Sequence, residues 1–288
     1  MKKYYLFSLL ALILLASTSL FAQEANKPDD KSDKKASLKI GADYISNNVF
    51  MGRSDTAAKP IFAPNITYTF AFGLYLTAAA DFIPSRQTNT LDDGNIGAGY
   101  NYTVGKFDGS ISFTKMFYAA TSTQVASSVS SETAASIEFG NDYITPGIAF
   151  NFAKGKGTSR NDYFFNPSLS HEFIFVQLFG DKDYLSITPA ASLNAGTQNF
   201  YDSYFARVNK VKHPKASAVL AAYRQNLTKF KLLDYEFSAP VEYSFKPFMI
   251  SFTPTLAIPE NKLPKTITNS QSAKAELFYF DLGLSLKF

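Results

Sequence analysis

Carboxylates at alternate positions are the side chains of this sequence that could do chemistry. Asp234 and Glu236 are two residues apart, and Glu242 has the same parity. Residues of one parity share a face of an extended strand, so Asp234 and Glu236 would be neighbours that could share a proton. A wall of such carboxylates in a membrane pore favours cations. Besides proton sharing and cation selection, a third interpretation is that the acids have no chemical role and are only solvated, or paired with basic side chains, inside a narrow barrel.

Histidine chemistry has few possible sites, because the chain contains two histidines. His171 lies in "NPSLSHEF" near Ser168 and Ser170, and a Ser–His pair on the outside of a barrel is a feature of membrane-embedded lipid hydrolases. A nucleophile and its base must lie within hydrogen-bonding reach. Both serines have the opposite parity to His171, so neither reaches it within one strand. A barrel-embedded lipid-modifying enzyme is therefore an alternative hypothesis with no catalytic residue assigned, and His213 is expected in an exposed loop.

The composition excludes other classes of site. The chain has no cysteine, which excludes a thiolate metal site and a cysteine nucleophile. The formal net charge of +4 includes Lys2 and Lys3, so the rest of the chain carries about +2. This balance is too weak to indicate a nucleic-acid partner. We therefore predict no nucleic-acid partner, metal or cofactor.

The N-terminus predicts export. Residues 1–22 form a signal peptide, in which two lysines precede an apolar run at 6–16 and small residues favour cleavage after Ala22. The run is short for a membrane span of about 20 residues. Residues 23–36 contain four acidic and four basic side chains and nothing to bury, which predicts a flexible periplasmic tether. Residues 37–288 remain for one domain.

The elements that position the carboxylates are predicted to be strands, because apolar and polar residues alternate along most of the chain. Strict alternation is typical of a strand whose two faces meet different environments. At the C-terminus, one face carries Phe278, Phe280, Leu282, Leu284, Leu286 and Phe288. Twelve segments are predicted, at 38–45, 62–70, 74–82, 95–104, 107–118, 133–140, 144–152, 163–175, 184–196, 233–246, 248–258 and 276–288.

The connections between segments favour a closed barrel over a soluble sandwich. Those after even-numbered segments are short, such as 71–73 and 246–247, whereas those after odd-numbered segments are longer and polar, such as 86–94. Short turns on one rim and long loops on the other are typical of outer-membrane barrels. In hydrocarbon every backbone donor must be paired within the protein, so the sheet can have no open edge. We predict an all-β fold, a transmembrane antiparallel up-and-down β-barrel of about twelve strands, in the cell outer membrane with both termini periplasmic.

The C-terminal stripe is then the lipid-facing side of the strand that closes the barrel. A terminal phenylalanine preceded by alternate apolar residues also resembles the signal that bacterial barrel-assembly machinery recognises. The predicted partners are outer-membrane lipid and, through Phe288, that machinery.

The opposite parity places charged side chains in the lumen. The lumen-lining candidates are Asp43, Asp81, Glu138, Glu172, Asp234, Glu236, Glu242, Lys246 and Asp281, with Lys39 and Lys287 on the same parity. Acids outnumber bases in this set, which favours cations in a pore. The leading hypothesis is a narrow channel for small polar solutes with a mild cation preference. The alternative is a structural or surface-binding barrel that has a filled interior and acts through its external loops.

Some residues do not fit this register. Lys115 has the lipid-facing parity, which is tolerable near a rim where its stem can reach the interface. Proline removes a ladder donor, so we expect the in-strand prolines at strand ends or bulges. They are Pro64, Pro146, Pro167, Pro189, Pro240 and Pro254. Within the long connection 197–231, "KASAVLAAYRQNLTKFKLL" has a helical period, and the helix could cap the mouth, enter the lumen or lie on the outer leaflet.

The stretch "DYISNNVFMGRS" at 43–54, followed by "KPIFAPNITYTFAFGLYL", resembles a family of uncharacterised outer-membrane barrels of Gram-negative bacteria. That family opens its first strand with Ser-x-Tyr-x-x-Arg-Gly and continues through a proline-containing second strand into a Gly-aromatic turn. The matching positions are Ser46, Gly52, Gly73 and Tyr75. Asn48 stands where the family has tyrosine, Met51 stands where it has arginine, and Arg53 follows the glycine. The resemblance implies a barrel in the outer membrane and no particular substrate.

Overall fold

The computed structural model describes residues 35–54, 59–88, 90–122, 124–157, 159–202, 225–260 and 276–288. Three of the sequence predictions lie outside these ranges, wholly or for the most part. They are the signal peptide at 1–22, the tether at 23–36 apart from its last two residues, and the exposed position of His213. The helix expected at 215–233 is described only from residue 225, where a single helical turn at 225–227 leads into a strand.

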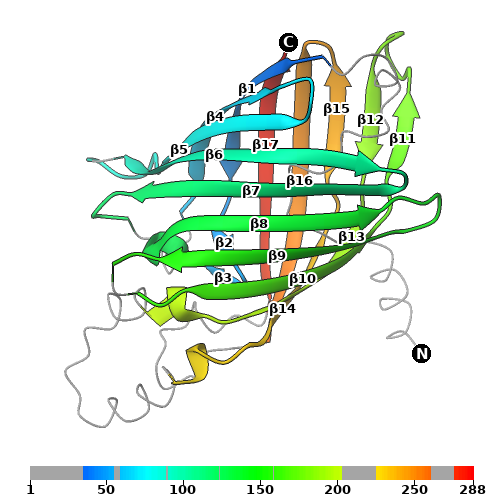
Figure 1. Cartoon of the computed structure of the whole chain (residues 1–288). Helices are drawn as coiled ribbons and strands as arrows, with labels where there is room; N and C mark the ends of the chain where they lie inside the picture. The colour runs from blue at the N-terminus through cyan, green and yellow to red at the C-terminus, as the bar shows by residue number, and fades with distance from the viewer. Residues whose placement is uncertain are drawn as a thin grey trace, which may run out of the picture.

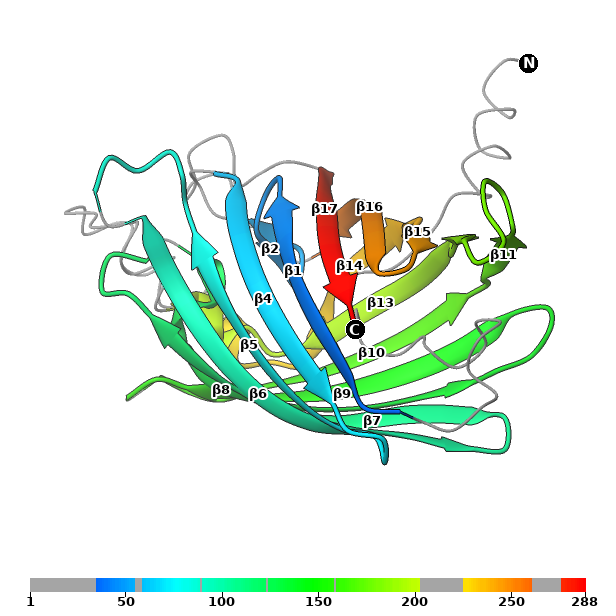
Figure 2. The ribbon, with the colours of Figure 1, turned by 90° about the horizontal axis from the view of Figure 1, so that it is seen from above.

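Antiparallel strands form one closed sheet within the described residues (Figure 1, Figure 2). The wall consists of β1 (Ser37–Ile45), β4 (Ile61–Thr69), β5 (Leu74–Phe82), β6 (Leu91–Val104), β7 (Phe107–Tyr118), β8 (Val129–Phe139), β9 (Thr145–Gly155), β10 (Asp162–Ser170), β13 (Ala190–Gly196), β14 (Lys231–Ser238), β16 (Phe248–Pro259) and β17 (Leu277–Lys287). Each strand pairs with the next in this order, and β17 pairs with β1 to close the ring of twelve. The predicted twelve-stranded up-and-down barrel is confirmed.

Three of the predicted strands are each divided in two. β11 (Phe173–Val176) continues the direction of β10, β12 (Tyr184–Ile187) precedes β13, and β15 (Val241–Phe245) follows β14. β16 accordingly changes its partner along its length, from β14 to β15. The predictions of single strands at 163–175, 184–196 and 233–246 were therefore wrong in continuity, although their number and order were right.

Two of the six in-strand prolines lie in these interruptions. Pro189 and Pro240 lie in the breaks before β13 and before β15, and Pro146 lies at the end of β9. Pro64, Pro167 and Pro254 lie inside β4, β10 and β16, where the expectation of strand ends or bulges was wrong. Each of these three coincides with a gap in one of the two ladders of its strand, between β4 and β5, between β10 and β13, and where β16 changes partner. A missing N–H is tolerated where no neighbouring strand requires it.

The two ends of the barrel differ in their connections. At one end, which we call the terminal rim, Leu38 and Phe288 exchange two backbone hydrogen bonds of 3.0 Å, and short turns such as 105–106 and 246–247 join the strands. At the other end, the loop rim, the strands are joined through the longer segments 46–60, 83–90, 119–128, 156–161, 197–230 and 260–276. This is the predicted alternation of short turns and long loops.

The outside of the barrel is apolar. On β17, Phe278, Leu282, Leu284 and Phe288 are exposed, and outward residues such as Ile96 on β6 continue the band around the wall. Soluble proteins do not expose contiguous apolar surfaces of this size, so the outside is the surface of a membrane-spanning barrel. Lys115 faces outward three residues before the end of β7 at the loop rim, and its Nζ lies 5.9 Å from the centre of the Phe117 ring. Among the described residues, no helix is long and apolar enough to cross a membrane.

Candidate functional site in the barrel interior

A small hairpin leaves the wall after β1 and folds into the barrel. β2 (Val49–Phe50) pairs with β3 (Arg53–Ser54) in a two-stranded sheet that is separate from the wall. Its turn residues, Met51 and Gly52, have φ values of 49° and 70°. Positive φ at both central residues is the geometry of a type I′ hairpin turn. We call residues 48–54 the inner hairpin, and it contains Gly52, one of the positions on which the family resemblance rests.

The inner hairpin crosses the interior near the loop rim. It starts beside β1, whereas it contacts β14, three strands from β1 in the ring, and β10, five strands from β1. The rings of Phe50 and Phe164 pack edge to face with centroids 5.7 Å apart. At the tip, a Cβ on Gly52 would lie 2.6 Å from Oδ2 of Asp234, so the glycine is seated directly on that carboxylate. A side chain at this position would collide with it.

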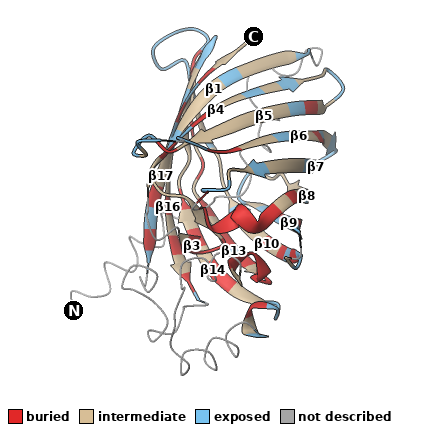
Figure 3. Cartoon of the chain, turned by 90° about the vertical axis from the view of Figure 1, so that its left-hand side faces the viewer, coloured by how far each residue is buried: buried red, intermediate tan, exposed pale blue. Residues whose placement is uncertain are grey.

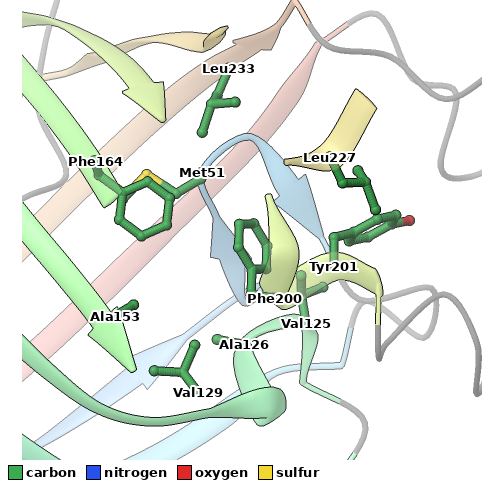
Figure 4. Packing of buried hydrophobic residues seen from close by; sticks show 10 residues of the cluster. All are labelled: Met51, Val125, Ala126, Val129, Ala153, Phe164, Phe200, Tyr201, Leu227 and Leu233. Atoms are coloured by element: carbon green, nitrogen blue, oxygen red, sulfur yellow. The ribbon is translucent and has the colours of Figure 1, made fainter. Parts of the chain in front are cut away.

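Apolar side chains seal this crossing (Figure 4). The cluster contains Met51 from the hairpin, Val125, Ala126, Phe200, Tyr201 and Leu227 from loop-rim segments, and Val129, Ala153, Phe164 and Leu233 from the wall. Val125 belongs to a short 3₁₀ helix, η1 (Val125–Ser128). Figure 3 shows the buried residues gathered around this helix and the neighbouring strands. The loop-rim interior is therefore a hydrophobic core inside the barrel. Each fully buried Phe, Leu or Met side chain in it stabilises the folded state by about 1.5–3 kcal/mol.

Polar contacts hold the hairpin on both sides. The Arg53 guanidinium donates from Nε and Nη2 to Oε1 of Gln198, at 3.1 and 2.9 Å, and lies 5.0 Å from the centre of the Tyr201 ring. On the other side, Asn48 Nδ2 donates to Gln124 Oε1 at 2.6 Å. Gln124 in turn donates to the Asp93 carboxylate on β6. The hairpin is thus tied to two separate loop-rim segments through the amide side chains of Gln198 and Gln124.

The predicted carboxylate pair on β14 belongs to this filled region. Asp234 is fully buried and accepts a 2.6 Å hydrogen bond from Asn194, and the positive charge of Arg53 acts on it. Glu236, which is 3% exposed, lies 3.4 Å from the hydroxyl of Tyr279. The two acids share a face as expected, but both are enclosed by protein, which favours a structural role over contact with solute.

A second group of predicted candidates lies on β1, β5 and β17 and keeps partial exposure. Asp43, Asp81 and Asp281 are half-buried and act on one another electrostatically. Asp43 accepts a 2.6 Å hydrogen bond from Asn65 on β4. A Cβ on Gly283 would lie 2.5 Å from Oδ1 of Asp43, so the carboxylate lies over the glycine and points along the inner face.

The remaining candidates lie towards the terminal rim. Glu138 and Glu172 are half-buried, and Glu242 accepts a 2.8 Å hydrogen bond from the hydroxyl of Tyr184. Lys246 is exposed in the turn between β15 and β16, so it belongs to the rim and not to the wall. The structure therefore divides the nine candidates among a filled region, a half-exposed acidic wall and the terminal rim.

Several interior residues were missed by the sequence interpretation. Asp93 and Glu132 lie on inward parity, but the segments predicted at 95–104 and 133–140 began after them, whereas β6 and β8 extend further towards the loop rim. Asp162 is buried at the start of β10, where it accepts hydrogen bonds from Thr197 and from the backbone of Asn199 and Phe200. Continuing the alternation past each predicted boundary would have found the first two residues. Within the described ranges, no three acidic or histidine side chains are arranged to hold a metal ion.

His171 has no catalytic arrangement among the described residues. It lies between β10 and β11, and its ring packs on Phe173 with centroids 4.5 Å apart. The Ser170 hydroxyl is directed at the carbonyl oxygen of Thr145. The Ser–His pair of the lipid-hydrolase hypothesis is thus not brought together here.

One turn at the terminal rim contains a carboxylate whose ionised form is stabilised by hydrogen bonds. Asp183 precedes β12 and accepts hydrogen bonds from the Tyr243 hydroxyl at 2.6 Å and from the backbone N–H groups of Leu178 and Phe179 at 2.9 and 2.8 Å. These donors, the Tyr243 hydroxyl foremost, lower the pKa of Asp183 below its ordinary value of 3.8. The turn is therefore held by an ionised group.

Neither a protein-family model nor a curated protein matches the chain. Among solved structures, the chain is similar to the KdgM porin, with a TM-score of 0.47, 11% identity, and coverage of 88% of this chain and 99% of that chain. It is also similar to the NanC porin, with a TM-score of 0.43, 10% identity, and coverage of 87% and 100%. For the outer membrane protein OprD from Pseudomonas aeruginosa the values are 0.35, 8%, 88% and 65%. The barrel assignment itself rests on the strand pairing.

Proposed function

We propose that the protein is an outer-membrane channel for small polar solutes with a preference for cations, and that its termini lie on the periplasmic side. The observation that carries the proposal is the half-exposed acidic wall formed by Asp43, Asp81 and Asp281 inside a closed barrel with an apolar outside. Carboxylates that line a pore stabilise cations and repel anions. The solutes expected are small and polar, because a twelve-stranded barrel is narrower than a large porin.

Planar-bilayer recordings test this function. In a KCl gradient, the reversal potential of the purified protein should indicate a cation preference, and Asp43→Asn combined with Asp281→Asn should reduce it. Both changes keep the size of the side chain and remove its charge. The matched control is Asp142→Asn, which removes an acid from an exposed terminal-rim turn. A wild-type reversal potential near zero or of the opposite sign would contradict the cation preference, and an equal potential in all three proteins would show that Asp43 and Asp281 do not cause it.

A second candidate function is favoured by the inner hairpin. Because the hairpin, η1 and the Phe200 region fill the loop-rim interior, the protein could instead be a closed structural or surface-binding barrel that acts through its loops. This hypothesis predicts silence at every applied voltage.

The orientation has its own test. Gly105 at the terminal rim and Gly157 at the loop rim both have positive φ, and a Cβ at either position would meet no atom within 4 Å, so cysteines there are matched. In intact cells, a membrane-impermeant maleimide should label Gly157→Cys and leave Gly105→Cys unlabelled. The reverse labelling would overturn the periplasmic placement of the termini.

The proposed assembly signal can be tested by deleting Phe288. Its side chain is exposed on the outside of the closing strand, and its backbone pairs with Leu38. Deletion should reduce the amount of folded, heat-modifiable barrel in outer-membrane fractions. An unchanged amount would show that the assembly machinery does not require this residue.

A further inference from the structure

The inner hairpin has the form of a flap hinged on two neighbouring strands. It leaves the wall after Ile45 of β1, and the chain rejoins the wall at Ile61 of β4, which pairs with Ile45. The two wall residues between which the hairpin is inserted are therefore paired neighbours at the loop rim. The tip lies against β10 and β14.

The strands of the hairpin do not pair with any strand of the wall. Its pairs, Val49 with Ser54 and Phe50 with Arg53, form a sheet of their own. Withdrawing the tip would therefore leave every paired wall strand intact. The hairpin would also keep its internal hydrogen bonds in either position, so it can move as a unit.

Apolar and polar contacts together hold the hairpin in place. Phe50 packs on Phe164 and, at 4.8 Å between centroids, on Phe200. Gly52 rests on Asp234, and a side chain at this position would collide with the Asp234 carboxylate. Arg53 is 6% exposed, and its guanidinium donates two hydrogen bonds to the neutral amide oxygen of Gln198.

From this geometry we infer that the inner hairpin is a resident plug of the channel, latched across the loop rim by Arg53 and by the seat of Gly52 on Asp234. Swinging the tip away from β10 and β14 opens the mouth. The inference rests on the proposed channel function and adds its gate. A closed and an open position that differ in the contacts of one hairpin form a two-state element whose population a substitution at those contacts can shift.

A tether across the seat tests the plug directly. The chain has no cysteine, so Gly52→Cys with Asp234→Cys introduces the only possible disulfide. A Cβ on Gly52 would lie 2.9 Å from Cβ of Asp234, and a disulfide needs about 3.8 Å, so a small retreat of the tip accommodates it. The oxidised protein should conduct little, and reduction of the same molecules in the bilayer should raise the conductance. The single variants Gly52→Cys and Asp234→Cys should not respond to the reductant.

A second variant removes the latch without any cross-link. Arg53→Gln abolishes the buried charge and its two hydrogen bonds to Gln198, which should raise the open probability about tenfold, given the strength of hydrogen bonds to charged groups. Lys115→Gln is the matched control, because it removes one positive charge from the outer face of β7. Heat-modifiable migration in gels confirms that each barrel is folded.

The outcomes separate the gate from the channel. If the wild-type protein conducts, but cross-linking and Arg53→Gln both leave the conductance unchanged, the plug inference is overturned and the channel stands. If the wild-type protein, the reduced double variant and Arg53→Gln are all silent, channel and plug both fail. Opening on reduction together with more frequent opening of Arg53→Gln supports the plug.

Discussion

The loop-rim half and the terminal-rim half of the interior are built on the same strands but are filled in different ways. At the loop rim, wall residues such as Phe164 and Asp234 meet segments that cross the barrel. Towards the terminal rim, inward side chains pair with their neighbours on adjacent strands, as Thr67 does with Thr77 at 3.0 Å and Ser110 with Ser136 at 2.9 Å. Alternation therefore decides which way a side chain points, whereas the crossing segments decide what it meets.

The largest effect is expected from Phe164→Ala, which tests whether the loop-rim half is a true core. Phe164 is 2% exposed and contacts the hairpin, so truncation leaves a cavity and should lower the free energy of unfolding by about 3–5 kcal/mol. The matched control is Phe165→Ala, one residue along on the lipid-facing side, where Phe165 packs on Phe150. Urea unfolding in lipid vesicles measures both. An equal decrease in the free energy of unfolding in both variants would mean that the interior cluster stabilises the barrel no more than a lipid-facing contact does.

A smaller effect is expected from Asp162→Ala, which tests the polar part of the same region. The carboxylate accepts hydrogen bonds of 2.6, 2.6 and 2.7 Å from the Thr197 hydroxyl, the Asn199 N–H and the Phe200 N–H. Removing it leaves buried donors without this acceptor, at a cost of about 1–3 kcal/mol. The same unfolding experiment applies, with the exposed Asp181→Ala as control. A loss no larger than that of the control would contradict the claim that these bonds organise the loop rim.

In the terminal-rim half, Thr67→Val should cost less than about 1 kcal/mol, which is near the net value of one neutral hydrogen bond. Thr67 contacts Thr77 on the adjacent strand and no crossing segment is involved. Urea unfolding again supplies the measurement. A cost as large as that of Phe164→Ala would remove the distinction between the two halves.

The smallest effect concerns the pH response of the terminal-rim turn at Asp183. Its pKa is lowered in the folded state, so the ionised carboxylate stabilises the turn above pH 3.8, and this contribution is lost as the pH falls through the lower folded value. The protection of the Leu178 and Phe179 amides from hydrogen exchange, corrected for the intrinsic rate at each pH, should decrease below pH 3.8. In Asp183→Asn the protection should be low and independent of pH. A pH dependence that persists in this variant would assign the effect to another group.

Part of this structure could be predicted from local pattern and part could not. The outward stripe from Phe278 to Phe288 and the inward position of Asp43 follow from alternation, because a strand places successive side chains on opposite faces. The positions of Pro189 and Pro240 indicated where a strand could be interrupted. They did not predict how the strand pairing would change there, because a proline does not reveal which of its two neighbouring strands will lose a hydrogen bond. Asp93 was missed because its strand extends beyond the membrane-length segment that the pattern suggested.

The inner hairpin could not be predicted from the local sequence pattern. "NNVFMGRS" does not alternate, and its type I′ turn places Met51 at a position of positive φ, where glycine or asparagine is usual. Its contacts with Phe164, Gln198 and Asp234 join residues far apart in the sequence. Such contacts exist only once the barrel has closed and brought β10 and β14 to the hairpin that follows β1.

The sequence by itself determined the number of strands, their order, the face that each side chain takes and the rim at which the chain ends. These properties follow from period-two alternation and from the lengths of neighbouring connections, which are local. Only the tertiary structure decided which carboxylates are sealed under the hairpin and which stay half-exposed on the acidic wall. The physical reason is that burial inside a closed ring depends on what crosses the ring, and that is set by contacts between strands that are distant in the chain.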